Sequence, residues 1–485
     1  MKELKVLLAA SEASPFAKTG GLADVAGSLP AALSKLGVDC RLIIPKYKSV
    51  YNMRPNTSKV GEFSVNLAGN VYLGEVEEAK IPKTQASVYF IKNDRFFFRD
   101  ELYQVKGRDY DDNASRFIFF SRAVLEVMKI IQFKPDIIFA NDWQTGLIPA
   151  YLKSPLYSDD VFYHGIKTVF SIHNLAYQGI FWHLDMPLTG LGWDYFTPEK
   201  IEFYGKINLL KAGIVFADQI TTVSPTYARE IQTQEMGCGL EGLLAERSND
   251  LVGIVNGIDY ETWNPENDKL IQKTYNSGKS AAGKAKNKLS LLEMFGLPID
   301  DRPLIGIVSR LDEQKGIDLL HNALSEIMGQ QVKLVILGKG KPEYEEFLAA
   351  AAAKHPDKLG VRIEFNEKIA HQIQAGADIF LMPSKVEPCG LNQLYALRYG
   401  TIPVVRKTGG LSDTIIDFDP ADGSGNGFVF EEYNPLSMIR AIKRVCETYR
   451  APKLWKKLVN NAMEADFSWN SSAQKYKELF EKVRS

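Results

Sequence analysis

Short runs rich in valine, isoleucine and leucine alternate with longer helical patterns along almost the whole chain. Strands without a polar face are typical of parallel sheets that helices cover on both sides, so the alternation predicts an α/β fold. The expected strands of the first half are 4–10, 40–45, 87–91, 136–140, 168–172, 219–223 and 252–255. Those of the second half are 304–309, 333–337, 362–365, 379–383, 401–405 and 427–430.

The length and the positions of these runs predict two doubly wound domains that face a central cleft. A chain of 485 residues favours two or three domains. One strand ends at Asn256-Gly257, and we expect the chain to cross into the second domain there. The aromatic stretch 174–204 has weak periodicity and is interpreted as an insertion over the first sheet. Ligands of such sheets bind at the carboxyl ends of the strands.

Composition excludes several classes of protein. The net charge of −1 argues against a nucleic-acid binder, and no apolar run approaches the ~18 residues of a membrane span. The N-terminus runs directly into a strand pattern, so we expect neither a signal peptide nor a transit segment. The four cysteines lie far apart without metal-site spacing, as free thiols of a reducing compartment do. The expected location is the cytoplasm.

The pentapeptide Lys-Thr-Gly-Gly-Leu occurs twice, at residues 18–22 and 407–411, each time between a strand-like run and a helical pattern. Paired glycines let a ligand approach the backbone closely. The unpaired N–H groups of the following helix favour phosphate or sugar oxygens. The repeat predicts two similar halves with glycine loops for one ligand, although two helix starts that are alike by chance remain the simpler alternative.

Loops at strand ends hold the other candidates. Asp142 and His173 follow strands of the first half, where a helix N-cap and a structural histidine are the alternative interpretations. In the second half, Arg310 and Lys315 flank a turn and are suited to a diphosphate leaving group. Glu387 lies in a loop stiffened by Pro388 and can accept hydrogen bonds from sugar hydroxyls. The Asp-x-Asp tripeptides 109–111 and 417–419 are interpreted as polar loops, and no metal site is expected.

Six segments together resemble the bacterial glycogen synthase and plant starch synthase family. They are residues 18–25, 173–179, 255–259, 310–316, 387–391 and 407–411, in the order of the family's motifs. The resemblance implies two Rossmann-like domains (the GT-B fold), with residues 1–255 on the acceptor side and residues 256–466 binding the nucleotide sugar. It also implies that a C-terminal helix, 467–485, packs back on the first domain.

The implied activity is retaining transfer of glucose from ADP-glucose, or UDP-glucose, to the non-reducing 4-hydroxyl of an α-1,4-glucan, without a metal cofactor. By position, the implied catalytic residues are Lys18, His173, Arg310, Lys315 and Glu387. The implied donor-binding residues are Gly20, Gly21, Asp24, Asp142, Asn174, Asn256, Cys389, Gly390, Leu391, Asn392, Gly409 and Gly410.

The chain departs from the family at Lys385 and Val386, where Arg-Phe is common, and at Asn392, where threonine is common. These positions bear on the choice of nucleotide. No carboxylate suggests itself for a double displacement, so we expect the incoming hydroxyl to attack from the face that the diphosphate leaves.

Three alternatives stay open at this point. One is a transferase with another acceptor, such as a cell-wall or sucrose-type enzyme. Another is a binding protein that has lost catalysis, although the charges at Arg310, Lys315 and Glu387 are all retained. The third is a dinucleotide-dependent oxidoreductase, which the incomplete glycine fingerprint at 338–340 disfavours.

Overall fold

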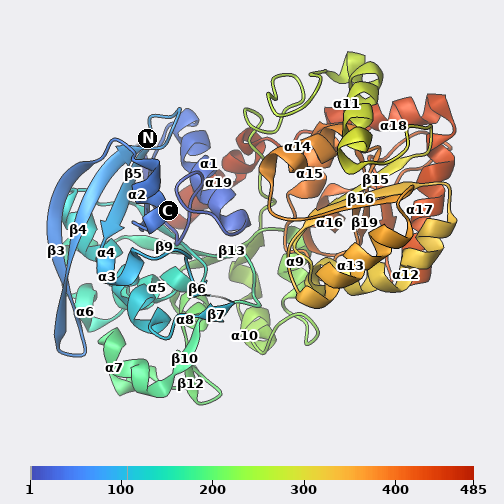
Figure 1. Ribbon diagram of the computed structural model, residues 1–485. Helices are drawn as coiled ribbons and strands as arrows, with labels where there is room; N and C mark the ends of the chain where they lie inside the picture. The colour runs from blue at the N-terminus through green and yellow to red at the C-terminus, as the bar shows by residue number, and fades with distance from the viewer. Residues whose placement is uncertain (1–2, 106) are drawn as a thin grey trace. The chain divides into compact units, whose positions relative to one another are not determined.

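The computed structural model describes residues 3–105 and 107–485, which form two compact units. Unit 1 comprises the described residues up to Gly257 together with Trp469–Ser485, and unit 2 comprises Ile258–Ser468. Each unit is a β-sheet flanked by helices (Figure 1). The crossings were expected at residues 255–257 and after residue 466, and the two units divide at 257/258 and 468/469.

The sheet of unit 1 is parallel over most of its width, and every strand expected in the first half is confirmed. Its parallel strands run in the order β14-β13-β9-β8-β1-β2-β5. Their bounds are β1 (Leu4–Ala9), β2 (Val38–Pro45), β5 (Ser87–Lys92), β8 (Ile137–Asn141), β9 (Lys167–Ile172), β13 (Gln219–Thr222) and β14 (Leu251–Gly253).

An antiparallel hairpin that sequence analysis did not predict extends this sheet at one edge. Strands β3 (Ser58–Leu67) and β4 (Asn70–Lys80) pair with each other, and β4 pairs with β5. Exposed residues occupy much of both strands, so they lack the continuous apolar runs used to find the others. The expected insertion 174–204 holds β10 (Ile180–Trp182) and β11 (Glu202–Phe203) of a small sheet, whose middle strand β12 (Lys206–Asn208) lies just beyond it.

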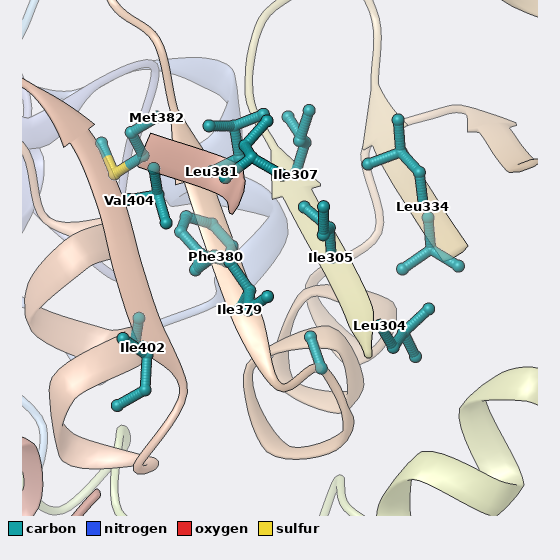
Figure 2. Close-up of a cluster of buried hydrophobic side chains, with 14 of the residues drawn as sticks. Leu304, Ile305, Ile307, Leu334, Ile379, Phe380, Leu381, Met382, Ile402 and Val404 are labelled. Atoms are coloured by element: carbon teal, nitrogen blue, oxygen red, sulfur yellow. The ribbon is translucent and has the colours of Figure 1, made fainter. Parts of the chain in front are cut away.

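The sheet of unit 2 has six parallel strands in the order β17-β16-β15-β18-β19-β20. Their bounds are β15 (Leu304–Val308), β16 (Lys333–Gly338), β17 (Leu359–Ile363), β18 (Ile379–Met382), β19 (Ile402–Arg406) and β20 (Phe428–Phe430). All were expected, although β17 begins three residues before the expected 362. Figure 2 shows the fully apolar side chains that the central strands bury.

Helices connect the strands in both units. In unit 1, the main helices are α1 (Gly21–Lys35), α4 (Asn113–Ile130), α5 (Leu147–Leu152), α8 (Leu209–Phe216), α9 (Pro225–Glu230) and α19 (Trp469–Arg484). In unit 2, they are α11 (Ser280–Phe295), α12 (Ile317–Gly329), α13 (Pro342–Lys354), α14 (Glu367–Gly376), α15 (Asn392–Arg398), α16 (Gly409–Thr414), α17 (Pro435–Tyr449) and α18 (Pro452–Glu464). No helix in the described part of the chain is long and apolar enough to cross a membrane.

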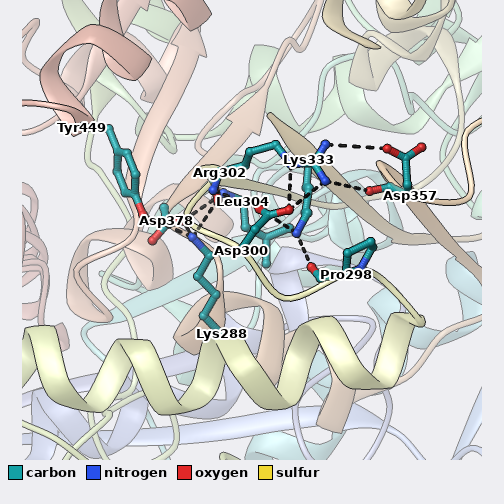
Figure 3. A network of polar contacts seen from close by, with 9 residues as sticks. All are labelled: Lys288, Pro298, Asp300, Arg302, Leu304, Lys333, Asp357, Asp378 and Tyr449. Atoms are coloured by element: carbon teal, nitrogen blue, oxygen red, sulfur yellow. Dashed lines mark hydrogen bonds and ion pairs between the residues drawn. The ribbon is translucent and has the colours of Figure 1, made fainter. Parts of the chain in front are cut away.

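A polar network joins the amino ends of the unit 2 strands, opposite to the edge where ligands of such sheets bind (Figure 3). Lys288 of α11 donates to Asp378, just before β18, at 2.6 Å. The same carboxylate accepts the backbone N–H of Leu304 at 2.8 Å. Lys333 pairs with Asp300 at 2.9 Å. These bonds fix the starts of neighbouring strands, and so they also set the register of the strand ends.

The C-terminal helix α19 completes the hydrophobic core of unit 1. The rings of Tyr476 and Phe480 are buried, and their centroids lie 5.4 and 5.3 Å from that of Phe139 on β8. The amide of Gly257 lies beside Trp469, because a Cβ on Gly257 would fall 2.6 Å from the Cα of Trp469. The last helix is therefore part of the first unit, although nearly the whole chain separates it from β1.

We predict that Phe480→Ala lowers the free energy of unfolding of unit 1 by about 3–5 kcal/mol, because it leaves a cavity against Phe139. Urea denaturation followed by tryptophan fluorescence measures this effect. Lys482→Ala, an exposed position on the same helix, should change stability by less than about 0.5 kcal/mol. Equal losses in the two variants would contradict the packing role of α19.

Candidate active site

In unit 1, the site residues gather where the order of the strands reverses. From β1 the sheet proceeds to β2 on one side and to β8 on the other. Ligands of doubly wound sheets bind at the carboxyl ends of the strands at such a point. The loop after β1 carries Lys18, the loop after β8 carries Asp142, and the loop after the neighbouring β9 carries His173.

The first glycine motif builds the open start of helix α1. Gly20 is the N-cap residue and supplies no side-chain cap, and Gly21 begins the helix. Lys18 is half exposed and pairs with Asp24, in the first turn, at 2.6 Å. A Cβ on Gly20 would meet only the carboxylate of Glu12, at 3.9 Å. Space therefore remains beside the helix start, as the sequence predicted.

Glu12 is a candidate that sequence analysis did not nominate. Its side chain is buried and accepts hydrogen bonds from the backbone N–H and the hydroxyl of Thr19, the latter at 2.9 Å. Burial raises the pKa of this carboxyl, against the hydrogen bonds from Thr19 and Gly20 that lower it. Glu12 therefore holds the loop that carries Lys18. Position alone gave no signal for it, because the contact depends on how the loop folds back.

Asp142 and His173 are linked directly. The Asp142 carboxylate accepts the backbone N–H of His173 at 2.7 Å, and the backbone N–H of Asp142 donates to Ser171 at 2.9 Å. Asp142 has a φ of +57°, which non-glycine residues rarely adopt and which is common at functional sites. This carboxylate is thus more than the helix N-cap of the alternative interpretation, since its side chain makes no N-cap bond.

Burial shifts the pKa values of both residues toward the neutral form. It raises the pKa of the Asp142 carboxyl to about 7, helped by the nearby Glu12 and opposed by the hydrogen bond from His173. It lowers the pKa of the His173 imidazole to about 3. His173 is therefore uncharged at neutral pH, and Asp142 is only partly ionised.

The two asparagine candidates, Asn174 and Asn256, both lie in unit 1, although Asn256 was expected to begin the second domain. Asn174 follows His173, and its side-chain oxygen accepts the backbone N–H of Ala176 at 3.1 Å, as in a tight turn. Asn256 comes after β14, which is separated from β9 by β13. Its side chain is 3% exposed, and within the described residues its Oδ1 has no hydrogen-bond partner. An unsatisfied buried oxygen is costly, so Asn256 is available for a bound group.

Unit 2 repeats the same arrangement. From β15 its sheet proceeds to β16 on one side and to β18 on the other. The loop after β15 carries Arg310 and Lys315, and the loop after β18 carries Glu387. The structure therefore brings together, at one reversal point, two loops that are about seventy residues apart in the sequence.

A two-pronged ion pair joins these loops. The Lys315 ammonium donates to both oxygens of Glu387, at 2.8 and 2.7 Å. The buried hydroxyl of Ser384 donates to the same carboxylate at 3.0 Å. Asp312 accepts the backbone N–H of Lys315 at 3.0 Å and begins the short helix Glu313–Lys315. The side chains of Lys315 and Glu387 are 20% and 7% exposed, so the ion pair is largely buried.

Gly316 lets the two loops approach each other. Its φ is +75°, and a Cβ at this position would fall 2.1 Å from the carbonyl oxygen of Pro383. Arg310 is more exposed than Lys315, and its guanidinium bonds Gln314 at 3.1 Å and lies 3.5 Å from Asp312. Both cations thus occupy one turn, as the spacing predicted.

The second glycine motif has a different role from the first. A Cβ on Gly409 would fall 2.1 Å from the backbone oxygen of Glu387, and one on Gly410 would fall 2.0 Å from that of Cys389. The N–H of Gly410 donates to the carbonyl of Glu387 at 3.1 Å. These glycines therefore pack closely against the backbone of the Glu387 loop, whereas Gly20 borders open space.

The rest of the Glu387 loop leads into helix α15. Gly390 has a φ of +73°, Cys389 is buried, and Leu391 is the N-cap residue of the helix. The side chain of Asn392 donates to the carbonyl of Val308, at the end of β15, at 2.9 Å. Asn392, which stands where threonine is common in the family, thus forms a hydrogen bond between the start of α15 and the end of β15.

Comparisons with known proteins match both units. The family described as "Starch synthase catalytic domain" matches residues 5–246, and the family "Glycosyl transferases group 1" matches residues 292–465. The glycogen synthase of Geotalea daltonii is 48% identical, with 99% of each chain covered. The glycogen synthase of Geobacillus stearothermophilus is 46% identical, with 99% of this chain and 98% of the relative covered.

Two solved structures are also similar. The catalytic domain of starch synthase IV from Arabidopsis thaliana, bound to ADP and acarbose, has a TM-score of 0.90 and 33% identity, with 99% of each chain covered. Sucrose-phosphate synthase from Thermosynechococcus elongatus has a TM-score of 0.59 and 16% identity, with 99% of each chain covered, and it shares the fold alone.

Two parallel α/β sheets, each with basic and acidic side chains at its reversal point, define a GT-B glycosyltransferase. Within that class, the chain belongs to the glycogen synthase and starch synthase family. Its activity is that of a glycogen synthase, a glucosyltransferase. The alternative of an oxidoreductase is therefore wrong.

The raised pKa of Asp142 predicts a dependence of stability on pH. Between about pH 4 and pH 7 the folded protein keeps a proton that the unfolded chain releases. The contribution of Asp142 to the free energy of unfolding therefore falls as pH rises through that window. Asp142→Asn removes the titration but retains an oxygen for the N–H of His173. As pH rises from about 5 to about 8, the free energy of unfolding of the variant should therefore increase relative to that of the native protein, by roughly 1 kcal/mol or more.

Urea denaturation at the two pH values measures the effect. Asp100→Asn is the control, because that side chain is 84% exposed. Parallel stability curves for native protein and Asp142→Asn would show that the Asp142 carboxyl has an ordinary pKa.

Proposed function

We propose that this glucosyltransferase uses ADP-glucose and extends an α-1,4-glucan at its non-reducing 4-hydroxyl with retention of configuration. The observation that carries the proposal is the pair of cations, Arg310 and Lys315, in one turn at the reversal point of the unit 2 sheet. The relative of 33% identity is bound to ADP and acarbose, a nucleoside diphosphate and a saccharide analogue, which supports this choice of donor and acceptor.

Lys315 and Arg310 neutralise the diphosphate as the bond to glucose breaks. An ammonium has three N–H donors, and Glu387 accepts from it at both of its oxygens. The third N–H of Lys315 serves a diphosphate oxygen. The guanidinium of Arg310 supplies a second, permanently charged donor. Lys18 is a further proposed cation for the donor, and we expect no metal requirement.

Glu387 binds the sugar while Lys315 holds its carboxylate in place. A carboxylate has about four lone-pair sites, and Lys315 and Ser384 take three of them. The remaining site accepts a glucose hydroxyl. Cys389, Gly390, Leu391 and Asn392 shape the loop around this carboxylate, and Gly409 and Gly410 support it from behind.

Unit 1 residues act on the glucose and the acceptor. His173, Asp142, Asn174 and Asn256 offer hydrogen bonds to sugar hydroxyls, and the amides that follow Gly20 and Gly21 favour oxygens of the donor. The departing diphosphate oxygen takes the proton of the incoming 4-hydroxyl, which attacks from the same face. No side-chain nucleophile takes part in this mechanism.

We place the enzyme in the cytoplasm. The four cysteines of the chain, Cys40, Cys238, Cys389 and Cys446, are free thiols. Free thiols persist in reducing compartments.

Lys315→Ala and Arg310→Ala should each reduce turnover by ~10²–10³, because each removes a donor that stabilises charge in the transition state. Lys315→Ala also leaves Glu387 buried without its cation and so costs stability. The double variant Lys315→Ala/Glu387→Gln removes that charge and should recover stability without recovering turnover. Initial rates and thermal melts of all three variants separate the two effects.

Lys443→Ala is the matched control, since Lys443 also pairs with a glutamate, Glu326, but on the exposed face of α17. It should keep full turnover. Near-native turnover in either Arg310→Ala or Lys315→Ala would refute the assigned role in the diphosphate site.

Transfer of radiolabelled glucose into glycogen tests donor and metal requirement together. We expect incorporation from ADP-glucose well above that from UDP-glucose, and equal rates with and without EDTA, because Arg310 and Lys315 replace a metal ion. Greater incorporation from UDP-glucose than from ADP-glucose would contradict the proposed donor. Loss of activity in EDTA, restored by a divalent cation, would contradict the proposed charge neutralisation.

A further inference from the structure

The last residue of β8, Asn141, contacts the imidazole of His173 inside unit 1. The Nε2 of His173 lies 2.9 Å from Oδ1 of Asn141, and both side chains are buried. We propose that Asn141 is a positioning residue, which holds the proton of His173 on Nε2 and leaves Nδ1 to accept a hydrogen bond from a sugar hydroxyl. This inference rests on the proposed contact between His173 and the sugar.

The orientation of the Asn141 amide follows from its other contacts. Its Nδ2 donates to the carbonyl oxygens of Ala9 at 3.2 Å and Phe139 at 3.0 Å. Carbonyl oxygens accept only, so the amide nitrogen has to face them. The reversed amide would place Oδ1 against two carbonyl oxygens in a site without solvent. Oδ1 is therefore fixed toward the imidazole of His173.

The proton position on His173 follows in turn. An amide oxygen accepts only, so Nε2 has to carry the proton of their shared hydrogen bond. Burial holds the pKa of the imidazole near 3, so at neutral pH the ring has a single proton. Within residues 3–105 and 107–485, no hydrogen bond of Nδ1 is seen. Nδ1 is thus left as an acceptor nitrogen.

The strand pairing makes this geometry rigid. Asn141 pairs with Ser171 in the parallel register of β8 and β9, which sets the loop of His173 beside the loop of Asp142. Asp142 binds the backbone N–H of His173, and Asn141 binds its ring. Two consecutive residues at the end of β8, Asn141 and Asp142, therefore fix both the side chain and the backbone of His173. Alignment of this kind is what a hydrogen bond that strengthens in a transition state requires.

Nitrogen NMR of ¹⁵N-histidine-labelled protein tests the proton position. The chain has six histidines, so the signals of His173 are assigned by their loss in His173→Gln. Between about pH 6 and pH 8, Nδ1 should resonate as an unprotonated nitrogen and Nε2 as a protonated one. In Asn141→Ala the ring loses its fixed acceptor, and both nitrogens should move toward averaged positions.

Asn287→Ala is the matched control. The Nδ2 of Asn287 also donates to two carbonyls, of Lys273 and Gly283 at 2.8 and 2.9 Å, and its Oδ1 also accepts one N–H. This variant should lose comparable stability and leave the His173 signals unchanged. A protonated Nδ1 in the native protein overturns the proposal, whether or not Asn141→Ala folds, and so does an unchanged His173 spectrum in folded Asn141→Ala.

Kinetics connect the proton position to the reaction. Asn141→Ala should lower kcat by roughly 10-fold or more, with the donor KM changed by less than about 3-fold, because the wrong tautomer weakens a transition-state contact. Native kcat in Asn141→Ala with altered His173 signals overturns the positioning role. Full turnover in His173→Gln refutes the proposed contact of His173 with the sugar, whereas the spectra still decide whether Asn141 fixes the proton.

Discussion

The ion pair between Lys315 and Glu387 is the interaction on which the unit 2 site depends. It joins the loops after two neighbouring strands and places a cation against a nearly buried carboxylate. At Gly316, Gly409 and Gly410 the loops come so close together that a Cβ would clash with the neighbouring backbone. Charge and close backbone packing therefore occur together at this site, and exchanging either residue of the pair alone costs stability.

Unit 1 holds its site loops with hydrogen bonds in addition to the ion pair of Lys18 and Asp24. The hydrogen bonds join Glu12 to Thr19, Asp142 to the backbone of His173, and Asn141 to the ring of His173. Burial favours the uncharged forms of Asp142 and His173. Unit 1 thus offers hydrogen-bonding groups suited to sugar hydroxyls, and unit 2 offers charges suited to a diphosphate.

Sequence patterns predicted the parallel strands because these are buried on both faces and read as continuous apolar runs. The hairpin β3–β4 escaped because exposed residues interrupt its apolar positions. Motif residues such as Lys315 and Glu387 were found by type and position, but their contact required the strand order. Glu12 and Asn141 were missed because their partners are set by loop folding and strand register. The likeness of the two glycine motifs concealed different surroundings at Gly20 and Gly410.

The return of α19 to unit 1 has a consequence for synthesis on the ribosome. Unit 2 is one continuous segment, so it can complete its fold while translation proceeds. Most of unit 1 precedes unit 2 in the chain, but it lacks Tyr476 and Phe480 against Phe139 until unit 2 has been translated. The half of the enzyme that is made first is therefore finished last, and its nascent sheet keeps an uncovered apolar surface for most of the elongation time.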